Sequence, residues 1–260
     1  MIDLFYRRQA MILGTLSMIG LLVFWQIAVD SGFINPFFIS TPSQVWAEFL
    51  VQLEDGQVAA NVGATLYCFA WSMGLATVVG IVLGMLAGWF SDVEAALEPF
   101  IWFKYSAPTV AFYPLFVAWL GYGTPTIIAI AFLFALTPIY ANTLSGIKNI
   151  DRDLAKAARS FGARPLDVFL QVALPGSVPV MMAGLRLGVG RALTGVVVAE
   201  LFGANAGLGY AITYYGQLMQ TTKMMVSIAI VILLGVILTQ ILSYFETKTD
   251  AWRVDSGPLI

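Results

Sequence analysis

Charged side chains are scarce in this sequence, and the densest group of them lies in residues 151–165. This stretch holds four of the thirteen basic residues: Arg152, Lys156, Arg159 and Arg164. It pairs no nucleophile with a base and has no metal-ligand spacing. The whole chain lacks His, which excludes imidazole metal sites and His-based proton transfer, and it lacks a G-x-x-x-x-G-K-[ST] phosphate loop. The chemistry available here is therefore recognition of another protein rather than catalysis.

The composition of 151–165 predicts a short helix, a sharp bend and a second helix. Asp151 can cap the first helix, and Asp153 lies in the first turn, where the helix dipole favours a carboxylate. Gly162 suits the left-handed conformation that ends a helix, and Pro165 suits the first turn of the next one.

One side of this predicted helix is apolar but narrow. Leu154, Ala158 and Phe161 follow helical spacing, with Ala157 at the edge of their face. The opposite face holds Arg152, Lys156, Arg159 and Ser160. A solvated loop helix is the simpler interpretation. However, the small alanines and the narrow stripe favour a groove in a partner protein.

Glu200 is the second candidate, because an acid in an apolar helix is costly unless it is paired or hydrated. Arg191 lies nine residues away, about 13 Å along a helix, which is too far for a direct pair. Glu200 therefore either faces a pore or makes structural hydrogen bonds with another helix. Arg186, Arg191 and Lys104 either attract an anionic solute or extend to the membrane interface.

Prolines and aromatic residues supply the remaining pathway candidates. Pro108, Pro114 and Pro138 each remove a backbone hydrogen bond and are expected to kink a helix. Such breaks line a pathway in some transporters and only shape the packing in others. Phe112 and Tyr113 have the same two interpretations, and so do the nearby aromatic residues Phe116, Trp119 and Tyr122.

The composition indicates an all-α polytopic membrane protein. Of 260 residues, 59% are hydrophobic and only 11% are charged, against about 25% charged in an average soluble domain. The net charge of −2 gives no indication of nucleic acid. The single cysteine, Cys68, cannot form an intrachain disulfide and is expected to pack in the interior.

Apolar runs predict six transmembrane helices. They cover residues 10–29, 62–90, 100–120, 126–146, 180–203 and 224–245. Outer loops are expected at 30–61, 121–125 and 203–223, the first with a short amphipathic helix opening at Thr41-Pro42-Ser43. A short turn is expected at 91–98 and a tail at 246–260, both on the inside. Gly80, Gly84 and Gly88 form tandem small-xxx-small motifs, which predict a helix packing face.

The distribution of charge orients these spans. Residues 148–191 carry seven basic side chains, whereas 30–61 carry none. Because basic residues concentrate on the cytoplasmic side, both termini are predicted to be cytoplasmic.

A longer spacing pattern runs through the polar stretch: Lys156-Ala-Ala, three residues, Gly162, nine residues, Val172, one residue and Leu174-Pro175. It resembles the EAA loop of binding-protein-dependent ABC import permeases, which reads Glu-Ala-Ala, three residues, Gly, nine residues, Ile, one residue and Leu-Pro. The spacing agrees throughout. Val172 replaces Ile, and Lys156 replaces Glu, so a contact made by that Glu would change sign here.

Shorter motifs resemble the nitrate, sulfonate and taurine permease branch of the family. The run from Pro108 to Gly123 is similar to its Pro-x-x-A-x-x-P-L-x-x-x-W-x-G-x-G stretch. Gly184-Leu-Arg186 and Glu200…Gly207-Leu-Gly209 are similar as well. The resemblance covers about residues 60–246.

The resemblance implies a type I ABC importer permease-like fold in the bacterial inner membrane. The expected partners are a second copy of the chain, two ABC ATPase subunits, a periplasmic solute-binding protein and the lipid bilayer. ATP and Mg belong to the ATPase, and this chain itself needs no cofactor. Residues expected to couple to the ATPase are Asp151, Asp153, Leu154, Lys156, Ala157, Ala158, Phe161, Gly162 and Arg164. Pathway candidates are Pro108, Phe112, Tyr113, Arg186, Arg191 and Glu200.

The expected organisation has three parts. Residues 1–60 form an N-terminal span and periplasmic loop, 61–246 form the permease core with its coupling helix at 151–165, and 247–260 form a cytoplasmic tail. The branch suggests a sulfonate, taurine, nitrate or another organic anion as solute. The alternative class is an ATP-independent secondary transporter or channel that uses Glu200 as a coupling carboxylate.

Overall fold

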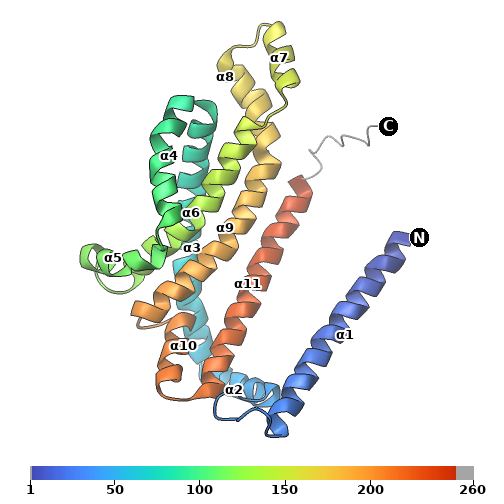
Figure 1. Cartoon of the computed structure of the whole chain (residues 1–260), viewed down its shortest axis with the longest axis vertical. Helices are drawn as coiled ribbons and strands as arrows, with labels where there is room; N and C mark the ends of the chain where they lie inside the picture. Colours follow the sequence, from blue (N-terminus) through green and yellow to red (C-terminus); the bar gives the residue numbers. More distant parts are fainter. Residues whose placement is uncertain (1, 250–260) are drawn as a thin grey trace.

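The structure is a computed structural model that describes residues 2–249, and every regular element within that range is a helix (Figure 1). The order is α1 (Ile2–Asp30), α2 (Pro42–Glu54), α3 (Gln57–Trp89), α4 (Ser91–Ser106), η1 (Thr109–Phe112), α5 (Tyr113–Leu120), α6 (Thr124–Lys148), α7 (Arg152–Ser160), α8 (Pro165–Val168), η2 (Phe169–Ala173), α9 (Leu174–Gly203), α10 (Leu208–Gln217) and α11 (Thr221–Thr249).

The described chain contains five helical segments long and apolar enough to cross a membrane. They are Ile12–Asp30, Gln57–Trp89, Thr124–Lys148, Pro165–Gly203 and Thr221–Tyr244. The all-α polytopic prediction is confirmed. Five of the six predicted spans correspond to these segments, whereas the third, at 100–120, is not one continuous helix.

The third predicted span is broken at Pro108. Helix α4 begins at Ser91, so residues 91–98 are helical and the predicted turn there is wrong. It ends at Ser106, and the following Ala107, with a φ of −90° and a ψ of 132°, is extended. Proline disfavours helical conformation in the residue before it, which accounts for the break. Pro114 lies in the first turn of α5, where it interrupts no hydrogen bond, so the kink expected there is absent.

The fifth predicted span starts earlier than expected. Helix α9 begins at Leu174 and follows α8 through the π-helical turn η2, so the predicted start at residue 180 is wrong. In η2 the Leu174 N–H donates to the Phe169 carbonyl, five residues back. This wider turn precedes Pro175 and relieves the clash that its ring would make in a regular helix. Pro175 is thus accommodated within one long segment.

The predicted outer loop at 203–223 is also largely helical. Its helix α10 buries Leu208, Ala211 and Tyr215 on one side, and the Tyr215 hydroxyl donates to Gln57 Oε1 at 2.6 Å. In the first outer loop, the predicted amphipathic helix is confirmed as α2. Thr41 caps α2 through a reciprocal box with Gln44.

Glycine-mediated contact between α3, α6 and α9 forms the centre of the bundle. A Cβ atom placed on Gly84 of α3 would lie 2.6 Å from Thr143 Cβ of α6, and one on Gly88 would lie 2.7 Å from Ile147 Cβ. Helix α9 also approaches α6 closely, because a Cβ on Gly195 of α9 would lie 2.8 Å from the Ala131 Cα of α6. The packing face predicted from the glycine motifs is confirmed.

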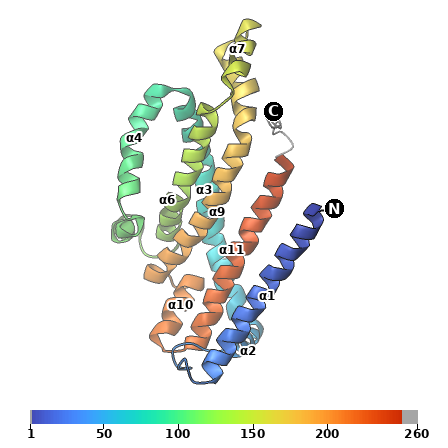
Figure 2. The ribbon, with the colours of Figure 1, turned by 45° about the vertical axis from the view of Figure 1, so that its right-hand side comes forward.

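The long helices run between two distinct ends of the molecule. Figures 1 and 2 show α7 projecting from one end, while α2 and α10 lie near the other. The N-terminal end of α1 and the C-terminal end of α11 both point toward the α7 end.

Candidate functional site

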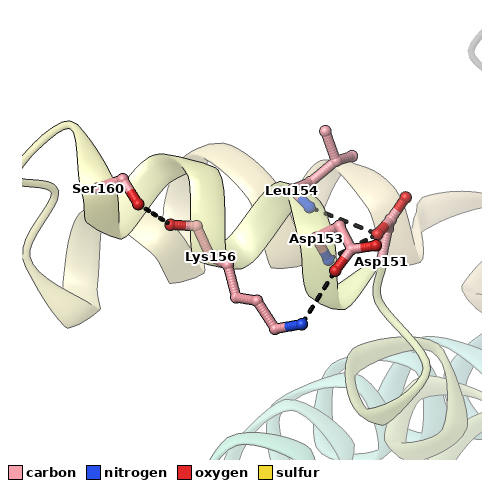
Figure 3. Close-up of polar contacts among 5 residues, drawn as sticks. All are labelled: Asp151, Asp153, Leu154, Lys156 and Ser160. Carbon is pink, nitrogen blue, oxygen red and sulfur yellow. Dashed lines mark hydrogen bonds and ion pairs between the residues drawn. The ribbon is translucent and has the colours of Figure 1, made fainter.

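The start of α7 is fixed by its own sequence. Asp151 Oδ1 accepts hydrogen bonds from the backbone N–H groups of Asp153 at 2.8 Å and Leu154 at 3.4 Å (Figure 3). Asp153 lies in the first turn, and its carboxylate is 3.0 Å from Lys156 Nζ. The predicted cap is confirmed, and it satisfies two of the N–H groups in the first turn of an exposed helix.

The end of α7 is a left-handed glycine turn. Gly162 has a φ of +83°, its N–H donates to the Arg159 carbonyl at 3.0 Å, and the Ala163 N–H donates to the Ala158 carbonyl at 3.1 Å. This pair of bonds is the Schellman motif. The Arg164 N–H then donates to Asp167 Oδ2 at 2.9 Å and opens α8. The predicted bend is confirmed, and it holds α7 at a fixed angle to α8.

The exposed side of α7 carries unpartnered apolar side chains. Phe161 is 92% exposed and Leu154 is 58% exposed, and Ala157 is exposed beside them. Ala158 is half-buried against its own chain. The sequence predicted Ala158 within the apolar face and Ala157 at its edge. In the structure the two positions are exchanged, because Ala157 is exposed with Leu154 and Phe161 and Ala158 is partly covered.

Glu200 is buried in a polar contact between three helices, with 1% of its surface exposed. The Thr65 hydroxyl of α3 donates to the carboxylate, with its oxygen 2.9 and 3.0 Å from Oε1 and Oε2. The Gly209 N–H of α10 donates to Oε2 at 2.8 Å. The Leu208 N–H donates to the Thr65 hydroxyl at 2.9 Å. The partner on another helix is therefore Thr65, and the geometry favours the hydrogen-bonding role over a pore-facing one.

The two glycines after Glu200 are required by the same contact. A Cβ atom on either Gly207 or Gly209 would collide with the Glu200 side chain. The Glu200…Gly207-Leu-Gly209 motif thus acts as one unit, which fixes the turn between α9 and α10 and ties it to α3.

The two arginines of α9 have different environments. Arg186 forms an ion pair with Glu246 of α11, with Nη1 2.9 Å from Oε2. Arg191 instead lines a cavity of about 230 Å³ together with Lys104 of α4 and Thr137 of α6. Lys104 donates a hydrogen bond to the Thr137 hydroxyl.

The cavity lies beside the helix break at Pro108, because Ala107 and Thr109 on either side of that proline contribute to its lining. Sequence reasoning identified the charged residues separately but gave no signal that they meet. Lys104 and Arg191 are far apart in the chain, and only the tertiary fold brings the end of α4 and the middle of α9 to one cavity beside α6.

The aromatic pathway candidates Phe112 and Tyr113 do not line this cavity. Tyr113 belongs to the hydrophobic core with 8% of its surface exposed, and its hydroxyl has no hydrogen-bond partner. Phe112 is half-buried, and its ring centroid is 6.1 Å from that of Phe103. The six predicted pathway residues therefore do not gather in one site. The part of the chain that the structure describes also holds no group of three His, Cys, Asp or Glu side chains arranged to bind a metal ion.

Comparison with known proteins identifies the family. SsuC of Bacillus subtilis (strain 168), provisionally assigned as an aliphatic sulfonates transport permease protein, is 29% identical over 247 residues, covering 95% of this chain and 90% of SsuC. TauC of Escherichia coli (strain K12), a taurine transport system permease protein, is 29% identical over 252 residues, covering 95% and 91%. The fold is similar to that of a chain in an inward-facing structure of the MetNI methionine ABC transporter. That match has a TM-score of 0.67 and 17% identity, over 80% of this chain and 99% of that one.

The family model for binding-protein-dependent transport system inner membrane components matches residues 76–250, which is more than half of the sequence. This match includes the helix α7, Glu200 with its Gly207-Leu-Gly209 turn and the Lys104–Arg191 cavity, whereas Thr65 precedes it. The chain therefore belongs to the family of binding-protein-dependent transport system inner membrane components.

Proposed function

We propose that α7 is the element through which this permease subunit docks onto its ATPase. As a member of an ABC importer family, the chain works with ATPase and binding-protein partners and is not itself an enzyme. The single observation that carries the proposal is the 92% exposure of Phe161 on a helix that projects from one end of the molecule. An exposed aromatic side chain of this kind is typical of an anchor that fills a pocket in a partner.

Other residues in and beside α7 complete the surface that is proposed to contact the ATPase. Leu154 and Ala157 extend the apolar contact beside Phe161, and the small Ala157 lets a partner backbone approach closely. Asp151 and Gly162 fix the two ends of the helix. The remaining coupling candidates Asp153, Lys156, Ala158 and Arg164 shape or border this surface.

Movement of α7 is expected to reach the membrane through α9. Helices α8 and α9 and the π turn between them form one segment, Pro165–Gly203, and the Schellman turn joins α7 to its start. In the proposed cycle, ATP binding closes a dimer of ATPase subunits, each with ATP and Mg. A permease subunit is seated on each of them through α7. The two bundles then switch from inward-open to outward-open, and hydrolysis resets them.

Orientation and assembly complete the proposal. The α7 end faces the cytoplasm of a cell whose inner membrane holds the protein, so both termini are cytoplasmic. The end with α2 and α10 receives solute from a periplasmic binding protein. The transporter contains two copies of the chain, each with a core at 61–246, an N-terminal part at 1–60 and a tail at 247–260. Of that tail, residues 250–260 lie outside the described residues.

The solute is proposed to be a small anion. Two relatives are named for the transport of sulfonates and taurine. A selective binding protein can supply the specificity, so the permease needs no tight solute site of its own.

Replacing Phe161 tests the docking role. F161A removes the proposed anchor without disturbing the fold, because the ring is exposed and touches little of its own chain. We expect the amount of co-purified ATPase per permease to fall by roughly tenfold or more, as for a typical anchor residue. F33A is the matched control, since Phe33 is 85% exposed but precedes α2 at the opposite end. Equal ATPase recovery with F161A and wild type would contradict the docking role.

A further inference from the structure

Six basic residues with described side chains form no ion pair with a carboxylate. Arg152, Arg159, Arg164 and Lys223 lie near the two ends of the molecule, whereas Lys104 and Arg191 lie between those ends. Lys148 pairs with Glu94, Lys156 with Asp153 and Arg186 with Glu246. Among the side chains that the structure describes, no carboxylate lies within 4 Å of either Lys104 or Arg191. The buried acid of the bundle, Glu200, is already satisfied by Thr65 and Gly209.

These two cations face one cavity rather than lying apart. Lys104 comes from the last turn of α4 and Arg191 from the middle of α9, and both line the cavity of about 230 Å³ against α6. Three residues with hydroxyl groups, Tyr105, Thr109 and Thr137, line the same space. Because both cations line this one small cavity, their like charges repel. The lining of the cavity therefore combines two cations with hydroxyl-bearing residues, and none of its lining residues is a carboxylate.

The alternative interpretation, in which the Lys104 and Arg191 side chains extend to the membrane surface, does not account for this arrangement. Arg191 lies five residues beyond Arg186 along α9, about 7.5 Å farther from the end that carries α7. The Lys104 ammonium is turned toward Thr137 of the neighbouring helix. Lys104 is half-buried and Arg191 is exposed on the single subunit, and two like charges at membrane depth are costly where little water is present to screen them. A bound anion would offset both charges.

We infer that the Lys104–Arg191 cavity binds a small oxyanion during transport. This inference rests on the proposed function and names the chemical class of its solute. The volume is below the range usual for drug-sized ligands and suits a solute of a few heavy atoms. Sulfonate, nitrate and carboxylate groups have the charge and the acceptor oxygens that a guanidinium, an ammonium and hydroxyls recognise. Phe134 and Pro138 supply an apolar wall for a short carbon chain.

The test uses the purified full-length chain, with whatever subunits co-purify, in phosphatidylcholine nanodiscs. Thermal unfolding is followed during titration with ethanesulfonate, and with ethyl methyl sulfone as a neutral probe of similar shape. We expect ethanesulfonate, but not the sulfone, to raise the midpoint, since a ligand that binds the folded state stabilises it. In K104Q/R191Q the apparent affinity should fall at least about tenfold, because charged hydrogen bonds are lost.

Two further variants separate charge from packing. K104R/R191K keeps both charges and should keep most of the response to ethanesulfonate. R186Q removes an equal charge from the same helix outside the cavity and should leave the response unchanged. The single variants K104Q and R191Q replace the double variant if it fails to fold, and each should weaken the response.

Several outcomes would overturn the inference. One is a wild-type chain that ethanesulfonate does not stabilise, and another is an equal response in K104Q/R191Q. A third is stabilisation that requires phosphatidylglycerol in the nanodisc and not ethanesulfonate, which would assign the cavity to a lipid headgroup. Recovery of ATPase from the same preparation tells the two proposals apart. ATPase present without an anion response rejects this inference alone, whereas absent ATPase rejects the proposed function.

Discussion

At the scale of single residues, one buried carboxylate joins three helices at the end of the fold that carries α10. Glu200 accepts hydrogen bonds from Thr65 of α3 and Gly209 of α10, and Thr65 in turn accepts from Leu208. A carboxylate in an apolar helix is expensive to bury alone. These donors make it a joint between α3, α9 and α10 rather than a free charge in the bundle.

Thr65→Val tests this joint with a side chain of nearly the same shape. It leaves Glu200 buried with one donor fewer, and we expect a loss of about 1–3 kcal/mol in stability. The single cysteine, Cys68, is 4% exposed, so a thiol-reactive fluorogenic dye reports the unfolding midpoint. T194V is the control, since the exposed Thr194 hydroxyl only donates to the Gly190 carbonyl of its own helix. A midpoint for T65V equal to that of T194V would show that Glu200 does not depend on Thr65.

Lys156 is the residue where this chain departs in charge from the pattern it resembles. Its side chain is 74% exposed, and it pairs with Asp153 on the same turn. Since a Glu at this position would meet a basic surface, we expect Lys156 to meet an acidic patch on its ATPase. K156E should therefore reduce co-purified ATPase several-fold at low ionic strength, and the deficit should shrink as salt screens the contact.

The control for K156E is K223E, the same reversal of charge at the start of α11, near the opposite end of the molecule. ATPase recovery that is unchanged in K156E at low salt would reject the proposed acidic patch.

Local features of single residues were predictable, and non-local ones were not. The Asp151 cap and the Gly162 turn depend on residues within four positions in the chain, so the sequence predicts both. The convergence of Lys104 and Arg191 depends on where the tertiary fold places α4 and α9. No spacing in the sequence encodes that arrangement.

At the scale of elements, the contact between α3 and α6 depends on the absence of side chains at the glycine motifs. Gly84→Leu should overpack this contact, because even its Cβ would lie 2.6 Å from Thr143 Cβ. Overpacking of this kind typically costs about 1–3 kcal/mol. Gly74→Leu on the same helix is the control, since nothing lies within 4 Å of a Cβ there. The dye assay should show a lower midpoint for G84L alone, and equal midpoints would contradict the packing role.

The boundaries of elements were the least predictable part of the fold. Pro108 breaks its helix as expected, but Pro175 does not, because the π turn at Phe169–Ala173 gives its ring room. Helix α10 was missed because its buried residues Leu208, Ala211 and Tyr215 are spread among glycines and polar residues. That helix is stabilised by packing against α9 and α11 rather than by its own composition.

At the scale of the whole molecule, one continuous helical segment joins the proposed ATPase-docking helix to the proposed anion cavity. Helix α7 presents Phe161 at one end, and the segment Pro165–Gly203 that follows it carries both Arg191 and Glu200. A displacement of α7 would therefore move a wall of the Lys104–Arg191 cavity. It would also act on the joint with α3 and α10. We propose this connection as the physical basis for coupling ATP hydrolysis to solute movement.

The most direct test of docking onto an ATPase is to tag this chain, purify it from its native membranes in mild detergent and identify the accompanying proteins by mass spectrometry. We expect an ATPase subunit in equal amount to the permease, with a solute-binding protein recovered after crosslinking. Recovery of the chain as a homo-oligomer alone, with no ATPase even after crosslinking, would contradict the role of this chain as an ATP-driven permease subunit.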